Sequence, residues 1–314
     1  MADTGKTKGV LLLAFGGAES LEDVEPFLKN ILKGRPVTPE MVEKARERYR
    51  KIGGGSPLLE ITRAQAAALE SRLNEGGRDN YRVYVGMRFW HPYIKEAVRE
   101  MWGDGIEEAV AIVMAPHSSR AATGGYLYDL DAALKTTAGV PEMSFPEDWH
   151  THPAYIDAVA EKMEEAIEEF PEKPKKEGLL VIFSAHSLPL SMLKGDPYLK
   201  KLEGTIEELI KQVPLPYRLA YQSKSGGPVE WLGPEVEEVI AKAKGEGRKG
   251  VLVVPLSFVS DHVETLYDID VVFKEAAEAC GLSFFRSGSL NTSPRFIELL
   301  AGLVETHPRV KNPA

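Results

Sequence analysis

The chain has 314 residues, of which 43% are hydrophobic and 27% are charged, and its formal net charge is −9. This length exceeds one compact core and suits two units of about 150 residues, with the composition of a globular protein. A negative chain without a block of Lys and Arg disfavours nucleic acids and anionic lipid surfaces as partners.

Targeting signals are not evident in the sequence. The apolar run from Val10 to Phe15 is too short for a signal peptide, and no apolar run reaches the roughly 18 residues of a membrane-spanning helix. Cys280 is the only cysteine, which excludes an intrachain disulfide framework and a four-cysteine iron–sulfur cluster within one chain. We therefore expect a cytoplasmic protein.

Strand and helix patterns alternate along the chain, which is typical of parallel sheets with crossover helices. In residues 1–150 we expect strands at 9–15, 81–87, 109–115 and 142–145, and helices at 20–32, 40–52, 57–74, 92–102 and 125–135. In residues 151–314 we expect strands at 179–183, 217–221, 250–255 and 282–285, and helices at 153–170, 198–213, 234–243, 263–280 and 294–305. Ser20 and Asp23 resemble a capping box before the first helix, and the Lys- and Pro-rich segment 171–177 is expected to be exposed.

The two halves follow one plan. Segments 9–15, 81–85 and 108–116 correspond in order to 178–183, 217–221 and 249–255, so that His117 and Ser118 correspond to Asp261 and His262. We predict an α/β protein of two similar lobes, residues 1–150 and 151–314, each with a parallel four-stranded sheet flanked by helices. If each lobe is wound like flavodoxin, its first and third strands are neighbours, and a crevice opens at their carboxyl ends.

His186 and Glu264 occupy this crevice in the second lobe, because His186 follows its first strand and Glu264 its third. We expect them to face one another. Histidine titrates near neutrality and is the natural proton acceptor, although a histidine in this place can also merely cap a loop. His262 and Glu264 are two residues apart, so their side chains would diverge on a helix. They can bind one metal only if this turn is not yet helical.

Acidic residues recur along the expected helix 263–280. Asp261, Glu264, Asp268 and Glu275 are spaced by three, four and seven residues, which on an α-helix places them along one face. Such a row could conduct protons or a cation, but the helix dipole alone accounts for acids in a first turn. No set of His, Cys and carboxylate residues has the spacing of a permanent zinc site.

Aromatic residues gather at strand ends and in loops, where they could line a slot for a flat ligand or simply pack in the core. They are Phe15, Tyr49, Phe89, Trp90, Tyr126, Trp231 and Phe258.

Together these motifs closely resemble the ferrochelatase family, which inserts metal at the end of haem synthesis, over nearly the whole chain. The resemblance rests on Phe15-Gly16-Gly17, segments 49–57 and 86–92, His-Ser-Leu-Pro at 186–189, Gln-Ser-Lys at 222–224, Trp-Leu-Gly-Pro at 231–234, and Asp-His-Val-Glu-Thr-Leu-Tyr at 261–267. It implies Rossmann-like lobes with a porphyrin in the cleft between them.

The resemblance also implies roles for single residues. His186 and Glu264 would form the metal-insertion centre and contact the iron. Because a porphyrin must lose two pyrrole protons as iron enters, we expect His186 to accept them and Glu264, with Asp261 and Asp268, to carry protons out or iron in. Porphyrin-binding positions of the bacterial branch are matched by Arg48, Tyr49, Ser56 and Tyr126. Pocket positions of the branch that resembles the mitochondrial enzyme are matched by Arg88, Phe89, Trp231 and His262. Phe15 and Phe258 would complete the aromatic walls.

Two departures bear on the substrate. Bacterial enzymes that act on coproporphyrin usually have a tyrosine where this chain has Phe15 and an arginine near Leu32, and these losses favour protoporphyrin IX. Alternatives are coproporphyrin III as substrate, a cobalt chelatase and a non-catalytic haem carrier. The expected partners are a porphyrin and ferrous iron as substrates, with no permanently bound cofactor, no iron–sulfur cluster and no nucleic acid. We expect a monomer with at most peripheral membrane contact.

Overall fold

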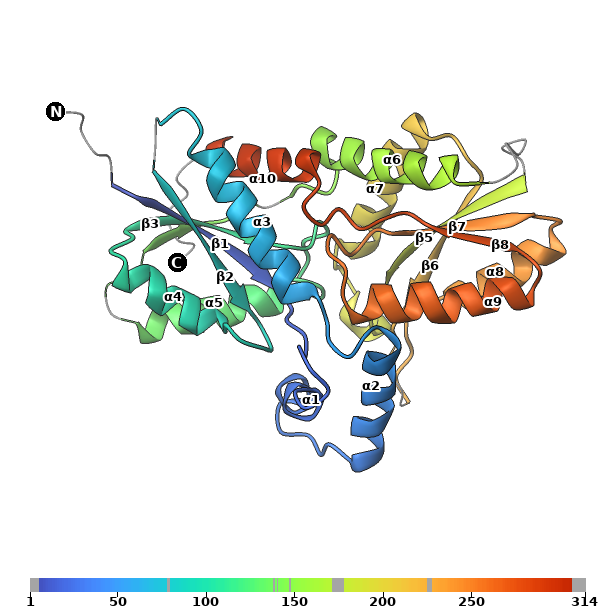
Figure 1. The fold of residues 1–314 in the computed structure, drawn as a ribbon, viewed down its shortest axis with the longest axis horizontal. Coiled ribbons are helices and arrows are strands. Elements are labelled where there is room, and N and C mark those ends of the chain that lie inside the picture. Colours follow the sequence, from blue (N-terminus) through green and yellow to red (C-terminus); the bar gives the residue numbers. More distant parts are fainter. Residues whose placement is uncertain are drawn as a thin grey trace.

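A computed structural model describes residues 6–77, 80–137, 139, 141–146, 148–170, 178–224 and 228–306 (Figure 1). The described strands form two parallel four-stranded sheets. The first contains β1 (Lys8–Ala14), β2 (Tyr81–Met87), β3 (Glu108–Val113) and β4 (Glu142–Ser144) in the order β2-β1-β3-β4. The second contains β5 (Leu179–His186), β6 (Tyr217–Gln222), β7 (Gly250–Pro255) and β8 (Ser283–Arg286) in the order β6-β5-β7-β8. The two orders are identical, which confirms the expected architecture of two similar sheets.

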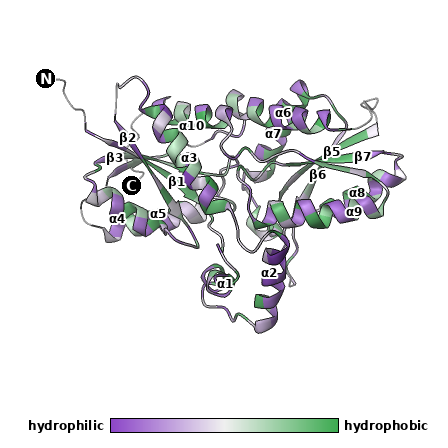
Figure 2. Ribbon diagram, in the orientation of Figure 1, coloured by the Kyte–Doolittle hydropathy of each residue, from purple (hydrophilic) through white to green (hydrophobic). Residues whose placement is uncertain are grey.

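Helices cover both sheets. In the first half they are α1 (Val24–Leu32), α2 (Pro39–Lys51), α3 (Leu58–Leu73), α4 (Ile94–Gly103) and α5 (Gly124–Thr136). In the second half they are α6 (Pro153–Glu168), the 3₁₀ turn η2 (Leu190–Met192), α7 (Tyr198–Gln212), α8 (Val236–Gly245), the π-helix η3 (Glu264–Phe273), α9 (Lys274–Ala279) and α10 (Pro294–Thr306). Helices α1 and α2 project from the body of the molecule, and α2 is mostly hydrophilic (Figures 1 and 2).

The central strands form because continuous apolar runs are buried on both faces by the crossover helices. Every residue of β7 is buried, as are all residues of β1 after Lys8. One apolar core runs through both lobes, since it contains Leu12 of β1, Leu69 of α3, Phe183 of β5 and Leu300 of α10. Helix α10 packs against α3 and α6 and so joins the two lobes (Figure 1). The boundary at residues 150/151 stays a prediction.

Two expected helices differ from the structure. The helix expected from residue 20 begins at Val24, because the Ser20 hydroxyl and Asp23 bond to each other in a turn that precedes it. The helix expected at 263–280 is a π-helix as far as Phe273 and α-helical only from Lys274. Since a π-helix has i→i+5 hydrogen bonds, the spacing rules of an α-helix do not apply to its side chains. The segment expected to be exposed at 171–177 lies outside the described residues.

Across the described ranges, no helix is both long enough and apolar enough to span a membrane.

The shared core predicts that Phe296 of α10 is essential for stability. Its side chain is fully buried and lies against Trp149, with ring centroids 6.1 Å apart. Phe296→Ala should lower the free energy of unfolding by about 3–5 kcal/mol through lost burial and the cavity that remains. Urea denaturation measures this loss, and Tyr128→Ala, at a position that is 71% exposed, should change it by less than about 0.5 kcal/mol. A similar small loss for both variants would contradict the shared core.

Candidate active site

The carboxyl ends of β5 and β7 meet at one edge of the second sheet. The strands are paired, with Ser184 opposite Pro255, and His186 is the last residue of β5. Glu264 is the first residue of the π-helix η3, which follows β7. His186 Nε2 lies 3.7 Å from Glu264 Oε1, so the expectation that these two residues face one another is confirmed.

Main-chain carbonyls fix the orientation of the two imidazoles beside Glu264. His186 Nδ1 lies 2.6 Å from the carbonyl oxygen of Ser187, and His262 Nδ1 lies 3.1 Å from that of Ser260. Since a carbonyl only accepts hydrogen bonds, each Nδ1 carries its proton, and in the neutral ring each Nε2 is left as the acceptor. His262 Nε2 lies 3.7 Å from Glu264 Oε2. The carboxylate is therefore flanked by two imidazole Nε2 atoms, one near each oxygen.

His262 reaches Glu264 because it precedes the π-helix rather than lying within it. The sequence left open whether this turn is helical, and the structure shows that His262 and Glu264 are close enough to share a ligand. Among the residues that the structure describes, no group of three or more His, Cys, Asp or Glu side chains is arranged to hold a metal ion.

Glu264 and Asp268 of the π-helix have different proton affinities. Burial disfavours the charge of Glu264, but the imidazoles of His186 and His262 and the guanidinium of Arg48 outweigh it and lower its pKa to about 2. Burial raises the pKa of Asp268 to about 6, against the hydrogen bond of 2.7 Å that Ser223 Oγ donates, and the charge of Glu264 adds to this rise. Near neutral pH, Glu264 is ionised, whereas Asp268 lies close to its titration midpoint.

Asp261 does not join these two acids in a row. Its carboxylate accepts hydrogen bonds from three side chains of and after β8: Arg286 Nη1 at 3.0 Å, Ser289 Oγ at 2.7 Å and Asn291 Nδ2 at 2.8 Å. Arg286 Nε also pairs with Asp270 at 3.2 Å. Glu275 is exposed on α9. The expected single acidic face is therefore wrong, since Asp261 precedes the helix and the helix is not an α-helix over Glu264–Phe273.

A cluster of aromatic and cationic side chains lies at the carboxyl ends of β1 and β2. The rings of Phe15 and Phe89 lie 4.7 Å apart, and Phe15 is 38% exposed. The Arg88 guanidinium lies 4.7 Å from the centroid of the Phe89 ring and 5.4 Å from that of buried Tyr126, and its Nε pairs with Asp129 at 2.9 Å. The structure thus brings Phe15, Arg88, Phe89 and Tyr126 together in the first lobe.

Tyr49 and Ser56 support the loop that follows β1. Both are buried, and the Tyr49 hydroxyl accepts a hydrogen bond of 3.3 Å from the Ala18 N–H. A Cβ atom added at Gly17 would lie 2.8 Å from Ser56 Oγ, so only glycine fits this approach. Arg48 is exposed on α2, with its guanidinium 5.5 Å from the centroid of the Tyr267 ring of η3.

Two further predicted residues lie on the second lobe. The Phe258 ring centroid is 4.6 Å from that of His262 and 6.4 Å from that of His186, so it contacts both imidazoles. Trp231 forms an isolated bridge with Pro189 of the loop after His186. Its indole Nε1–H is buried without a hydrogen-bond partner among the described residues.

A pocket of about 280 Å³ lies beside the π-helix. Its polar lining includes Arg48, Gln222, Ser223 and Asp268. Gln222 Nε2 donates to the main-chain oxygen of Glu264 at 3.3 Å, and Gln222 Oε1 is buried without a partner within the described ranges. The motif Gln-Ser-Lys at 222–224 thus lies beside the site, with Gln222 bound to Glu264 and Ser223 to Asp268. The strand order predicts this position, because β6 lies next to β5 and the end of β6 at Gln222 therefore lies beside His186.

The two-lobed α/β fold with equal parallel sheets is the architecture of chelatases of known structure. The fold of this chain is similar to that of the sirohydrochlorin chelatase SirB from Bacillus subtilis subspecies spizizenii in complex with cobalt, with a TM-score of 0.56 at 11% identity, covering 96% of this chain and 94% of that one.

The sequence matches identify the family. The family model of ferrochelatase matches residues 7–308. The chain is 40% identical over 304 residues to a ferrochelatase of Deinococcus radiodurans, covering 96% of both proteins. It is 42% identical over 314 residues to a ferrochelatase of Geotalea uraniireducens, covering 94% of this chain and 96% of that protein. This chain belongs to the ferrochelatase family, as the sequence motifs predicted.

Asp268 should make stability depend on pH. Its pKa is about 6 in the folded protein, above the ordinary 3.8, so folding favours the protonated form and stability falls as pH rises from about 4 to 6. Asn at this position stays neutral and still accepts from Ser223. Asp268→Asn should therefore gain stability relative to the wild type as pH rises, by up to about 3 kcal/mol at pH 7. Urea unfolding between pH 4 and 8 measures the difference, and a difference that does not vary with pH would contradict the raised pKa.

Proposed function

We propose that this protein inserts ferrous iron into protoporphyrin IX to give protohaem, with release of the two pyrrole protons. The observation that carries the proposal is the pair formed by His186 and Glu264, in which Nε2 of an imidazole whose Nδ1 is bound to a main-chain carbonyl lies 3.7 Å from the carboxylate. A base that accepts a proton beside a fixed negative charge is what removal of pyrrole protons requires. The proteins of the same family at about 40% identity support the reaction class.

His186 Nε2 accepts the pyrrole protons in this proposal. Glu264 stabilises the imidazolium that forms, because its charge is held by a pKa of about 2. Asp268, with a pKa of about 6, takes a proton on and releases it near neutral pH. Phe15, Phe89 and Phe258 supply flat apolar walls around the ring, and Arg48 and Arg88 supply positive charge for its carboxylates. His186 and Glu264 also contact the incoming iron, which is a substrate of the reaction.

The choice of protoporphyrin IX rests on what faces the substrate near β1 and α1. Phe15 is 38% exposed beside Phe89 and has no atom that ligates iron. Leu32, the last residue of α1, has no charge to pair with a carboxylate. Coproporphyrin III carries four carboxylates, whereas protoporphyrin IX carries two carboxylates and two vinyl groups, so an apolar residue at each place favours the latter. No permanently bound cofactor is needed for this reaction.

Removal of the proposed base is the first test. His186→Ala should lower kcat for anaerobic iron insertion, followed by visible absorbance, by about 10²–10⁴-fold, since the proton acceptor is lost. Porphyrin binding, followed by quenching of porphyrin fluorescence, should remain. His152→Asn is the matched control, because His152 is exposed and caps α6 by accepting from the Ala154 N–H, which Asn also does. Unchanged insertion by His186→Ala would refute the assignment of the base.

A cation at position 32 should change substrate preference. Leu32→Arg should raise kcat/KM for coproporphyrin III by roughly tenfold relative to protoporphyrin IX, through pairing with an additional carboxylate. Both porphyrins are assayed in parallel with the wild type. Ala132→Arg adds the same charge at an exposed position of α5 and should leave the ratio unchanged. A wild type that prefers coproporphyrin III would contradict the substrate proposal while leaving the reaction class intact.

A further inference from the structure

The main chain at His186 is held by side chains from outside its own strand. The Tyr198 hydroxyl lies 3.0 Å from the His186 carbonyl oxygen and 3.0 Å from Ser257 Oγ, and the His186 N–H donates to Ser257 Oγ at 3.3 Å. Because the carbonyl only accepts, Tyr198 donates to it, and Ser257 can then donate to the Tyr198 oxygen. These three bonds close a ring that fixes both peptide groups of His186.

Tyr198 is itself rigidly placed. It is the first residue of α7, is only 2% exposed, and its ring lies edge-on to that of His117. Its N–H donates to Asp196 Oδ1 at 3.0 Å, which satisfies one of the free N–H groups at the start of the helix. The hydroxyl that holds His186 therefore has little freedom to move.

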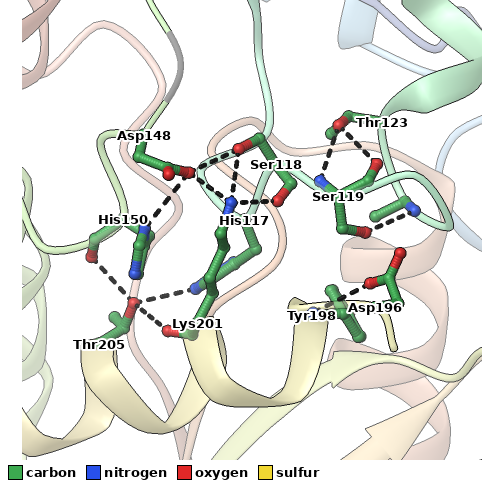
Figure 3. A network of polar contacts seen from close by, with 11 residues as sticks. His117, Ser118, Ser119, Thr123, Asp148, His150, Asp196, Tyr198, Lys201 and Thr205 are labelled. Carbon is green, nitrogen blue, oxygen red and sulfur yellow. Dashed lines mark hydrogen bonds and ion pairs between the residues drawn. The ribbon is translucent and has the colours of Figure 1, made fainter. Parts of the chain in front are cut away.

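Asp196 reaches the first lobe with its second oxygen. Asp196 Oδ2 accepts a hydrogen bond of 3.0 Å from the N–H of Ala121, in the loop between β3 and α5. One carboxylate thus joins the first-lobe loop to the start of α7. Figure 3 shows its contact with Tyr198. Through Tyr198, that connection continues to His186.

The rest of α7 strengthens this connection. Lys201 and Thr205 follow Tyr198 by three and seven residues and lie on the same face. Lys201 Nζ donates to Ser118 Oγ at 2.9 Å, and Thr205 Oγ1 lies 3.0 Å from His117 Nε2 (Figure 3). Burial lowers the pKa of His117 to about 3, so it is neutral and does not repel Lys201. The first two turns of α7 are therefore fixed to the loop after β3.

We propose that Tyr198 and Asp196 are positioning residues, which hold the His186 imidazole in register with Glu264 and couple that orientation to the first lobe. This inference rests on the proposed function, in which His186 Nε2 is the base. Among the contacts of the described residues, neither Tyr198 nor Asp196 forms a hydrogen bond or an ion pair with Glu264. Their contribution is to fix the peptide groups on either side of His186, and through them the imidazole.

Tyr198→Phe tests the proposal, because it removes one hydroxyl and keeps the ring. We expect kcat for iron insertion to fall roughly 10- to 100-fold with KM for the porphyrin nearly unchanged, since a misplaced base affects the chemical step rather than binding. Asp196→Asn keeps one acceptor oxygen and so holds either Tyr198 or Ala121, and it should show a smaller loss of kcat. Tyr84→Phe is the matched control, since Tyr84 is 3% exposed and donates to Asp104 Oδ2 at 2.8 Å in the first lobe.

A second measurement does not depend on activity. In the wild type with ¹⁵N-labelled histidine, at a pH where the His186 ring is neutral, its two nitrogens should have well-separated shifts, because Nδ1 then holds the proton and Nε2 does not. In Tyr198→Phe the separation should shrink as the tautomers mix, and in Tyr84→Phe it should not. His186→Gln assigns the signals.

The outcomes separate the two proposals. If the wild type inserts no iron, the proposed function fails, and the ¹⁵N comparison still decides whether Tyr198 orients His186. If the wild type is active and Tyr198→Phe retains both its kcat and its ¹⁵N pattern, the positioning role is refuted. An equal loss of kcat in Tyr84→Phe would refute it as well, because any buried hydroxyl would then have the same effect. If Tyr198→Phe does not fold, Asp196→Asn carries the same two measurements.

Discussion

The arrangement of the site depends on keeping a negative charge on Glu264. Its side chain is 30% exposed, so water alone does not stabilise the carboxylate. The charge of Arg48 and, when they carry a proton on Nε2, the charges of His186 and His262 stabilise it instead. The imidazoles serve this purpose only if their Nε2 atoms face the carboxylate, which the two Nδ1–H contacts to main-chain carbonyls ensure. The main chain at the ends of β5 and β7 must consequently be held in place. Pairing of these two parallel strands along their length provides the first part of that support.

The first lobe provides the second part. Gln65 of α3 is completely buried, and its Nε2 donates to Ser260 Oγ at 2.9 Å and to the Asn291 oxygen at 2.7 Å. Asn291 in turn donates to the Asp261 carboxylate and accepts from the Asp261 N–H. The turn that leads into the π-helix is thus connected to α3 of the other lobe. The shared apolar core keeps the two lobes together, and these hydrogen bonds fix the position of the turn relative to α3. Asp261 belongs to this support and turns away from the pocket, although its spacing from Glu264 made it look like part of an acidic row.

Local sequence patterns predicted those parts of the fold whose stabilising interactions are local or recur periodically along the chain. The run from Val10 to Leu13 and the segment 250–255 are continuously apolar, so their burial as parallel strands was predictable. The order of strands then placed His186 opposite Glu264. The π-helix was not predictable, because the same side chains fit an α-helical pattern and the choice depends on tertiary packing. The partners of Asp261 come 25 to 30 residues later, from β8 and the loop after it, and nothing at the Asp261 position indicates them.

Two carboxylates one turn apart on the π-helix have pKa values of about 2 and about 6, and this difference implies distinct tasks. If both had ordinary pKa values, both would be ionised near neutrality, and neither would take up a proton that His186 releases. With Glu264 fixed as an anion, its charge raises the pKa of Asp268. Under the proposed function, a proton that His186 releases is therefore passed on to Asp268. Ser223 contacts Asp268, and the pocket beyond is lined by Glu235 and Glu237, the latter with its own pKa raised by burial. Under the proposed function, Asp268 and then Glu237, both with a pKa raised by burial, give the released protons a route away from the porphyrin, while Glu264 stays charged for the next turnover.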